Sequence, residues 1–452
     1  MSPQPGRHRV ASRSRANPPS QARRDPPSQA RRDLPSLTGL RGVAATLVFI
    51  RHIDSDVEEA IPNMPLGNIG YCGVMFFFML SGFVLTWSAR PGTRKQFYWR
   101  RFARIYPLYL VAIALWFVVA WSFGLMGEFG SKPVAVLPSL LLVQAWVPTQ
   151  AIYFGWGGAV LWSLSCEAFF YLVFPIVYQR LLARTNAGRI RAALLVVVPT
   201  AAVACLAGAI DPRLDLALYA NPVVRVGEFV LGIVLGLMAL DGVRGTANQR
   251  RALAVLAVAW LAVPITLGYQ YSDHPGLIDT LTLPSFAIII FLVGTREADG
   301  GRVPIASARP LVYFGVVSYA FYLIHPGALA IVTELGLFDT ASATEAALAV
   351  VAGFLFSIAL GALLHHTVEK PAHRYLLRKF KRPPDQRTRP AARPAESMDG
   401  DGRAWVPIPA HGAADFAGGA AWGDAQAAGA DSAGRIPAPW DGEHTVIIAR
   451  RP

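Results

Sequence analysis

Long apolar runs, separated by short bursts of charge, constrain this chain more than any other feature of its sequence. Of the residues, 53% are hydrophobic and only 16% are charged, a composition that argues against a soluble α/β enzyme. We therefore predict an all-α, polytopic membrane protein with about ten transmembrane helices. Ten windows come close to the roughly 20 apolar residues that a helix needs to cross a bilayer: residues 37–53, 71–88, 105–126, 161–178, 192–210, 222–240, 253–267, 277–293, 311–332 and 346–366.

The distribution of positive charge predicts the orientation of these helices. If the N-terminus is cytoplasmic, the inner loops 89–104, 180–191, 240–251 and 295–309 hold 16 Lys or Arg, and the outer loops hold only Lys132 and Arg213. An eleventh apolar segment, residues 134–147, is short and contains Pro138 and Gln144. A crossing there would invert every later loop and destroy the asymmetry. We predict that it is re-entrant or interfacial and that both termini are cytoplasmic.

The two ends of the chain differ in composition from its centre. Residues 1–35 form a basic, disordered arm with the repeat PPSQARRD, and we expect no secretory signal there. Residues 382–452 form a disordered tail rich in Pro, Ala and Gly, which leaves residues 36–381 as the membrane domain. The net charge of +13 is explained by the arms and inner loops, so we predict no nucleic-acid partner.

Ionisable side chains within apolar windows are the first functional candidates, because each costs a few kcal/mol in a bilayer unless it is paired or hydrated. Arg41 and His52 are eleven residues apart, which on a helix puts them on one face and about 16 Å apart. Snorkelling of Arg41 and a capping role for His52 remain alternatives.

Further charged residues lie in the later windows. Arg101 and Arg104 belong to a cluster at the inner end of the third window, and guanidinium groups suit phosphates, although an ordinary cytoplasmic charge belt has the same composition. Glu167 places a carboxylate in the fourth window. His325 is a third ionisable group that we expect in the outer half of the membrane, although a lone helical histidine is more often a packing residue.

One later window carries signs of structural rather than chemical roles. Arg225 and Glu228 lie three residues apart, which predicts a mutually neutralising ion pair. Gly232 and Gly236 on the same helix predict a close helix–helix contact. The three cysteines, Cys72, Cys166 and Cys205, share no spacing, so we expect buried thiols and no metal site.

Six ordered motifs resemble those of the acyltransferase-3 family of integral membrane O-acyltransferases. They span residues 36 to 377 and follow the order of that family. They are the Arg41-x10-His52 element, the segment from Gly73 to Phe83, Arg101-x-x-Arg104, Trp162-Ser163-Leu164-Ser165-x-Glu167, Ser318-Tyr319 with Ile324-His325-Pro326, and Glu369-Lys370-Pro371.

The sequence also departs from the family pattern. Met75 and Ala168 stand where acidic residues are common, so we assign no acid to these positions. No hydrolase-like domain follows the last window. This favours transfer that is completed by the membrane unit or handed to a separate protein.

The resemblance implies transfer of an acyl group, such as acetyl, from cytoplasmic acyl-CoA to a hydroxyl of a cell-surface glycan or of a secondary metabolite such as a macrolide. His52 would be the general base or a transient acyl carrier, and Glu167 would orient or polarise it. Arg41, Arg101 and Arg104 would hold the phosphates of CoA. We predict that the acceptor is bound by Ser165, Tyr322 and His325.

Acyl-CoA is expected as a donor substrate and not as a resident cofactor, and we expect no permanently bound cofactor. The other partners are the hydroxylated acceptor and the lipid bilayer, with a bacterial inner or plasma membrane as the location. A secondary transporter or exporter of a polar metabolite is the main alternative, since ten spans and intramembrane charges suit one. A membrane sensor or scaffold is a weaker alternative, because it gives the buried His52 and Glu167 no purpose.

Overall fold

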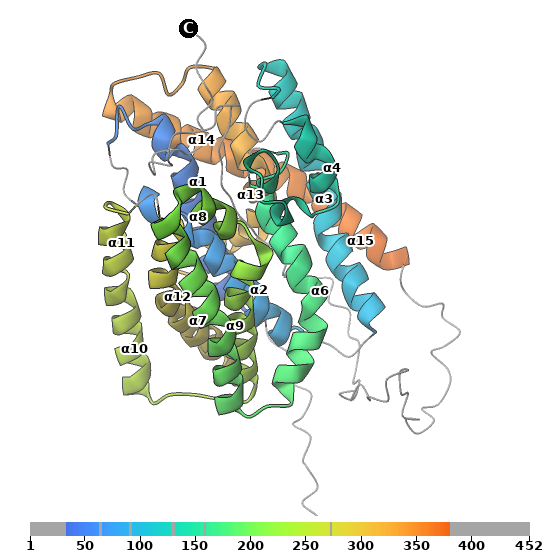
Figure 1. The fold of residues 1–452 in the computed structure, drawn as a ribbon, viewed down its shortest axis with the longest axis vertical. Helices are drawn as coiled ribbons and strands as arrows, with labels where there is room; N and C mark the ends of the chain where they lie inside the picture. The colour runs from blue at the N-terminus through green and yellow to red at the C-terminus, as the bar shows by residue number, and fades with distance from the viewer. Residues whose placement is uncertain are drawn as a thin grey trace, which may run out of the picture. The chain divides into compact units, whose positions relative to one another are not determined.

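A computed structural model describes residues 33–62, 66–89, 93–127, 132–157, 160–271 and 274–379. The predicted arm and tail therefore lie almost wholly outside the described residues. Within the described residues, the secondary structure is helical, with no strand, as the sequence predicts (Figure 1). The helices are α1 (Pro35–Ile53), α2 (Cys72–Trp87), α3 (Arg94–Ser122), α4 (Val136–Leu140), α5 (Gln150–Tyr153), α6 (Trp162–Leu182), α7 (Asn186–Ile210), α8 (Pro212–Tyr219), α9 (Pro222–Leu240), α10 (Ala247–Trp260), α11 (Ala262–Gly268), α12 (Pro275–Ala298), α13 (Arg309–Glu334), α14 (Ala343–Leu364) and α15 (Lys370–Lys379).

All ten predicted windows lie on helices. In the described part of the chain, seven helical segments combine the length and the apolar composition that a membrane crossing requires: Arg94–Ser122, Asn186–Ala207, Pro222–Leu240, Ala247–Gly268, Pro275–Ala298, Arg309–Glu334 and Ala343–Lys379. The other three windows fall on α1, α2 and α6. Helix α2 is apolar but only 16 residues long, and α1 and α6 carry the polar residues that the sequence singled out.

The segment at 134–147 does not form one continuous helix. It is divided among the short helices Pro133–Ala135, α4 and Gln144–Trp146, with Leu142 in the left-handed region at φ 58°. The five residues of α4 rise only about 8 Å, far less than the roughly 30 Å hydrocarbon layer. This agrees with the prediction of a re-entrant or interfacial segment.

Local sequence signals set where several helices begin. The side chains of Thr93 and Thr246 each accept a hydrogen bond from the backbone N–H of a glutamine three residues later. The side-chain oxygen of that glutamine in turn accepts a hydrogen bond from the backbone N–H of the threonine, which completes a capping box. Proline occupies the first turn of α1, α9, α12 and α13. The N–H groups of a first turn have no acceptor within the helix, so the N–H that proline lacks costs no helical hydrogen bond there.

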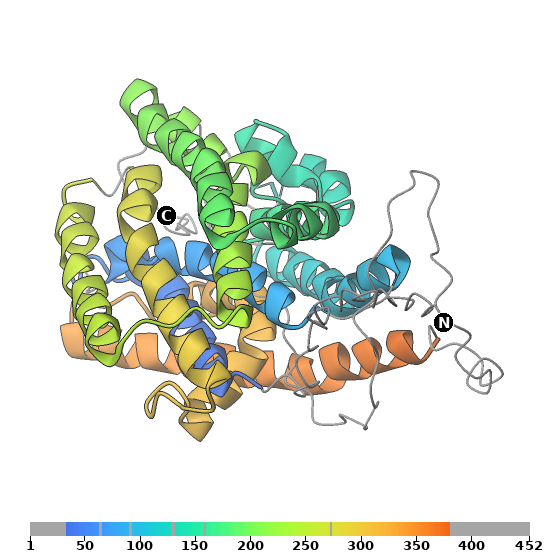
Figure 2. The same ribbon diagram turned by 90° about the horizontal axis from the view of Figure 1, so that it is seen from below.

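Helix α14 does not end where its α-helical hydrogen bonding ends. It continues through a π-helical turn, His365–Glu369, into α15, and the three segments form one long rod (orange in Figure 2). A π-turn holds one residue more than an α-turn, which changes the direction of every side chain that follows.

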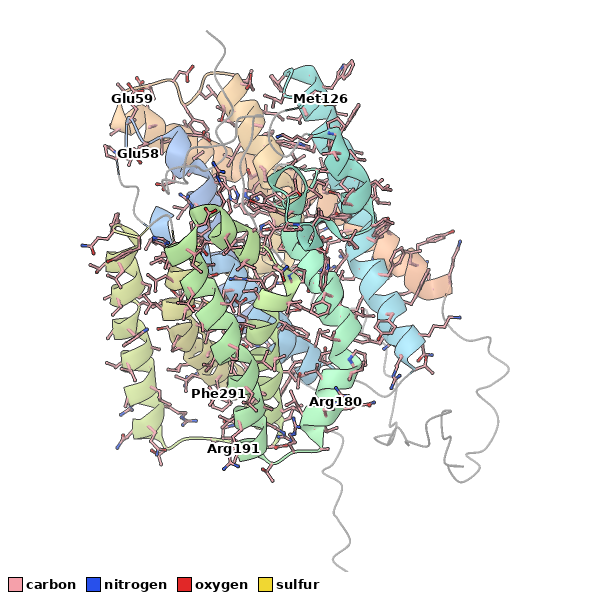
Figure 3. All side chains as sticks on the ribbon, in the orientation of Figure 1. Glu58, Glu59, Met126, Arg180, Arg191 and Phe291 are labelled. Atoms are coloured by element: carbon pink, nitrogen blue, oxygen red, sulfur yellow. The ribbon has the colours of Figure 1, made fainter. Side chains whose placement is uncertain are left out.

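The residues predicted on the two sides of the membrane lie at opposite ends of the helices. Figure 3 shows Arg180 and Arg191, from the predicted inner loop 180–191, at one end, and Glu58 and Glu59, from a predicted outer loop, at the other. The structure thus separates the two groups of loops along the helix axes.

Close backbone contact holds α2 against α9. A methyl group added at Gly232 would meet the carbonyl oxygen of Met79 at 1.9 Å, and one added at Gly82 would meet that of Phe229 at 2.2 Å. Gly236 has the same role against Phe83 and Thr86. The prediction of a packing face at Gly232 and Gly236 is therefore confirmed.

We expect Gly232→Ala to destabilise the protein, because the added methyl must push two backbones apart. Overpacking of this kind costs about 1–3 kcal/mol. Thermal unfolding in detergent would measure the loss. Gly353→Ala is the matched control, since its added methyl would have only ordinary contacts, the nearest at 3.5 Å. Equal melting temperatures for the two variants would contradict the packing role.

Candidate active site

Two histidines from distant parts of the chain meet in the interior. His52 lies in the last turn of α1 and His325 in the middle of α13, and both are buried. Nδ1 of His52 is 3.3 Å from Nε2 of His325, and the two rings meet edge to face. The sequence proposed both residues for the site but did not predict that they touch.

Their hydrogen bonds assign the protons on both rings. Nδ1 of His325 lies 2.9 Å from the carbonyl oxygen of Tyr322, so it carries the proton and leaves Nε2 as an acceptor. Nδ1 of His52 lies 2.8 Å from the carbonyl oxygen of Val48 and donates to it and to His325. The lone pair of His52 therefore lies on Nε2, which is buried and has no hydrogen-bond partner among the described residues.

Tyr322 and Ser163 extend this histidine pair toward α6. The Tyr322 hydroxyl donates to the carbonyl oxygen of Val160 at 3.2 Å and lies 3.4 Å from the hydroxyl of Ser163. The ring centres of Tyr322 and His325 lie 5.7 Å apart, and acceptor binding by these residues stays a prediction. The predicted Ser165 is also fully buried, but the serine at Tyr322 is Ser163, which the sequence analysis quoted only as part of a motif.

Glu167 lies at the centre of a second polar group. Its Oε1 accepts hydrogen bonds from Ser81 at 2.9 Å and from Tyr171, and the guanidinium of Arg101 lies 5.8 Å from the centre of the Tyr171 ring. The His52 ring is held by Val48 and His325 and not by this carboxylate. Direct orientation of His52 by Glu167 stays a prediction.

Arg104 forms an ion pair with Glu369, both of them buried. The same carboxylate interacts with Nδ1 of His365 at 2.9 Å, and the charge of Arg41 also acts on it. His365 and Glu369 begin and end the π-helical turn, which places both of them toward Arg104. Glu369 was part of a recognised motif, but spacing alone did not reveal that it joins two of the predicted phosphate-binding arginines.

Arg51, the neighbour of His52, fixes the C-terminal end of α1. It donates to the Tyr71 hydroxyl at 2.5 Å, lies over the Tyr71 ring and forms an ion pair with Asp54 at 3.2 Å. Burial raises the pKa of the Asp54 carboxyl, and Arg51 acts in the opposite direction. These contacts keep His52 at a fixed depth.

Comparison with known proteins decides the family. The model of the acyltransferase domain family matches residues 34–366, about three quarters of the chain. This chain belongs to the acyltransferase-3 family. The match covers all of the motifs up to His325, and it ends just before Glu369.

Three relatives of this family member carry informative names. It is 37% identical to the acyltransferase MdmB of Streptomyces mycarofaciens, over 76% of this chain and 92% of that protein. It is 28% identical to the exopolysaccharide production protein ExoZ of Rhizobium meliloti, over 60% of this chain and 80% of that protein. It is 24% identical to the O-acetyltransferase OatA of Staphylococcus aureus, over 64% of this chain and 49% of that protein. No solved structure matches.

The family, the relatives and the apolar helices together make this acyltransferase-3 member a multi-pass membrane protein and an O-acyltransferase. The resemblance stated from the motifs is confirmed. The enzymatic class is also confirmed, and the roles of the individual site residues stay predictions.

We expect Glu369→Ala to destabilise the enzyme strongly, by about 3 kcal/mol, because Arg104 would lose the carboxylate that compensates its buried charge. Asp241→Asn is the control: it weakens an ion pair with the buried Arg189, but Asp241 itself is 42% exposed, so its loss should cost less than about 1 kcal/mol. Detergent melting curves would measure both. Arg104→Met should recover part of the loss when combined with Glu369→Ala. Similar small decreases in melting temperature for Glu369→Ala and Asp241→Asn would show that the pair of Arg104 and Glu369 does not stabilise the fold.

Proposed function

We propose that this protein transfers an acyl group from acyl-CoA to a hydroxyl of a carbohydrate, such as a cell-surface glycan, or of a secondary metabolite such as a macrolide. The observation that carries the proposal is the buried Nε2 of His52, which has no partner among the described residues and belongs to a ring held on its other side. The names of the relatives, an O-acetyltransferase and an exopolysaccharide production protein among them, support a hydroxyl acceptor on a carbohydrate.

We further propose ten membrane crossings with both termini cytoplasmic, in a bacterial plasma membrane. The excess of Lys and Arg in four loops supports this orientation. The opposite placement of Arg180 and Glu58 along the helices supports it as well (Figure 3). In this arrangement Arg41 lies toward the cytoplasm and His52 toward the outer face, on one uninterrupted helix. Residues 36–381 are the catalytic unit in this proposal, between the basic arm and the Pro/Ala/Gly-rich tail.

The chemistry follows from the protonation of the histidine pair. Nε2 of His52 takes the proton of the acceptor hydroxyl as the hydroxyl oxygen attacks the thioester carbonyl carbon. The carbon–sulfur bond breaks, and the thiolate of CoA receives that proton from the imidazolium. His325 stabilises the transient cation on His52, because its Nε2 accepts the hydrogen bond from His52 Nδ1.

The donor would enter from the cytoplasmic side, with its phosphates at the arginines. Arg41 and Arg104 are buried around Glu369, and Arg101 lies beside Tyr171. Eleven helical residues between Arg41 and His52 span about 16 Å, a length comparable to the pantetheine arm. Acyl-CoA is a substrate in this scheme, and no resident cofactor takes part.

The remaining predicted residues have supporting roles. Tyr322 and His325 would position the acceptor at the histidine pair, and Ser165 supplies a buried hydroxyl without a partner among the described residues. Glu167 would polarise the site through Ser81 and Tyr171.

Membranes that contain the protein should transfer label from radiolabelled acetyl-CoA to a hydroxylated acceptor, and His52→Ala should reduce the rate by about 10²–10⁴-fold, the usual contribution of a general base. His366→Ala is the control, since this exposed histidine bonds to Tyr313 outside the pair. Wild-type transfer by His52→Ala would exclude the catalytic role. Label on the protein itself that brief treatment with acid or hydroxylamine removes, as expected for an acyl-imidazole, would indicate an acyl-carrier route, and no labelling from any acyl donor would favour a transporter.

Replacement of Arg101 and Arg104 by Gln should raise the KM for acetyl-CoA at least tenfold, because charge-assisted bonds to phosphate are among the strongest polar contacts. Because the loss of Arg104 also leaves the buried Glu369 unpaired, rates are compared per folded molecule; on that basis the same variant should use acetyl-pantetheine, which lacks the nucleotide, as well as the wild type does. Arg180→Gln, an exposed arginine at the same end of the protein, controls for bulk charge. An equal loss with both donors would place these arginines outside the donor site.

A further inference from the structure

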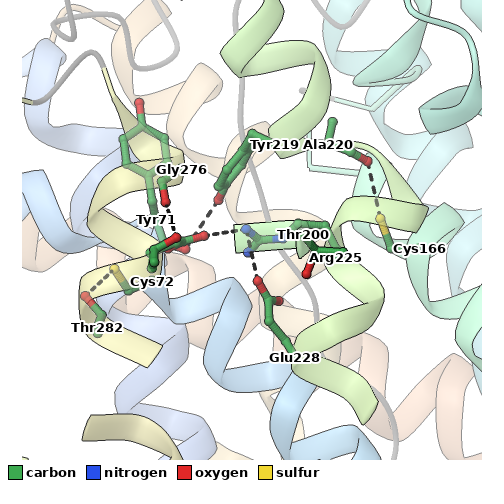
Figure 4. A network of polar contacts seen from close by, with 12 residues as sticks. Tyr71, Cys72, Cys166, Thr200, Tyr219, Ala220, Arg225, Glu228, Gly276 and Thr282 are labelled. Carbon is green, nitrogen blue, oxygen red and sulfur yellow. Dashed lines mark hydrogen bonds and ion pairs between the residues drawn. The ribbon is translucent and has the colours of Figure 1, made fainter. Parts of the chain in front are cut away.

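A second buried polar cluster, which the proposed chemistry does not use, surrounds Arg225 (Figure 4). We call it the Arg225 cage, and it brings together residues of five helices. Its members are Phe78 of α2, Trp162 of α6, Tyr219 of α8, Arg225 and Glu228 of α9, and Asp279 of α12.

Aromatic faces and carboxylates hold the guanidinium. Its carbon lies 4.7 Å from the ring centre of Tyr219, 5.6 Å from that of Phe78 and 6.0 Å from that of Trp162. Its Nη1 bonds to Asp279 at 2.5 Å and lies 3.2 Å from Glu228. The ion pair predicted from the sequence is confirmed, but the arginine has a second carboxylate partner from another helix.

Several hydrogen-bond donors and acceptors of the cage are not used by the contacts within it. Because one nitrogen serves both carboxylates, Nε and Nη2 of Arg225, Oε2 of Glu228 and Oδ1 of Asp279 have no hydrogen-bond partner among the described residues. The same holds for the indole Nε1 of Trp162. Buried polar atoms in proteins are nearly always bonded, so a concentration of donors and acceptors in one place points to a ligand.

The charge and the mixture of groups define the chemistry of that ligand. One guanidinium faces two carboxyl groups, so the cage has no surplus positive charge to offer a negatively charged ligand. Hydroxyls both donate and accept, which matches free carboxylate oxygens beside free N–H groups. The apolar edges of a sugar-like ring suit Tyr219 and Trp162.

The cage lies next to the histidine pair. On two helices, one residue contacts the cage and its immediate neighbour contacts the side of the histidine pair, and on α1 the neighbour of His52 reaches the cage only through Tyr71. His52 pairs with His325, whereas Arg51 holds Tyr71, whose ring meets that of Tyr219.

The same division holds on α2 and α6. Phe77 meets Tyr322, whereas Phe78 meets Trp162. Ser163 lies at Tyr322, whereas Trp162 lies in the cage. Neighbouring residues of the same helices therefore line the cage and the histidine pair.

We propose that the Arg225 cage is the acceptor site and that it takes a neutral, polyhydroxylated ring. This inference rests on the proposed function. It adds the site and the charge of the acceptor to that function.

Octyl β-glucoside, below its micellar concentration, and octyl β-glucuronide serve as acceptor probes, with radiolabelled acetyl-CoA and membranes that contain the full chain. The wild type should use the neutral glucoside at least tenfold better than the anionic glucuronide. Trp162→Phe and Glu228→Gln should each raise the KM for the glucoside about tenfold, the effect of one lost hydrogen bond, and leave the KM for acetyl-CoA unchanged. Glu228→Gln should also reduce the ratio between the use of the neutral glucoside and the use of the anionic glucuronide.

Trp260→Phe and Asp241→Asn are the controls: the first repeats the Trp to Phe change at the α10–α12 contact, and the second likewise converts a carboxylate to an amide, at the Arg189 pair. An unchanged KM for the glucoside in both cage variants, or a wild type that prefers the glucuronide, would overturn the proposal. Should the cage variants fold poorly, the probe preference of the wild type decides. If neither probe is labelled but another acceptor is, the cage assignment fails and the acyltransferase function stands; if nothing is labelled, the proposed function itself fails.

Discussion

Polar side chains can remain inside an apolar helix bundle only when other helices supply their partners, and α1 depends on this more than any other helix. Arg51 is held by Tyr71 and Asp54, and His52 is held by its own backbone and by His325. An unpaired group in hydrocarbon costs several kcal/mol, so these bonds determine which helices surround α1 and at what height. The contact between the two histidines thus arises from the same pairing that allows α1 to lie inside the bundle.

Much of this architecture could be predicted from the sequence. Hydropathy located all ten helical windows, and the segment 134–147 is broken as its short apolar run suggested, although the break falls at Leu142 and Pro138 lies within α4. Helical spacing placed Arg41 and His52 on one buried face of α1, and both are buried. These features depend on residues close together in the chain, where periodicity is informative.

The partners of the polar residues could not be predicted, because they depend on contacts between distant segments. Nothing near Arg225 indicates that Asp279, more than fifty residues later, accepts its shortest hydrogen bond. Nothing in the spacing of the serines indicates that Ser163, and not Ser165, meets Tyr322. The contact between His52 and His325 also joins residues 273 positions apart, and it follows from the packing of α1 on α13. A motif thus identified residues that matter without stating which of them touch.

The π-turn at His365–Glu369 adds one residue to the last helix beside the buried pair of Arg104 and Glu369. Five residues of a π-turn advance about as far around and along the helix axis as four residues of an α-helix. A single-residue deletion within the turn would therefore restore ordinary α-helical bonding and leave α15 pointing in nearly the same direction, where the Trp99 indole donates to the carbonyl oxygen of Leu376. The spacing between His365 and Glu369 would fall from four residues to three, so the deletion would alter the bond between these two side chains without turning the helix that follows.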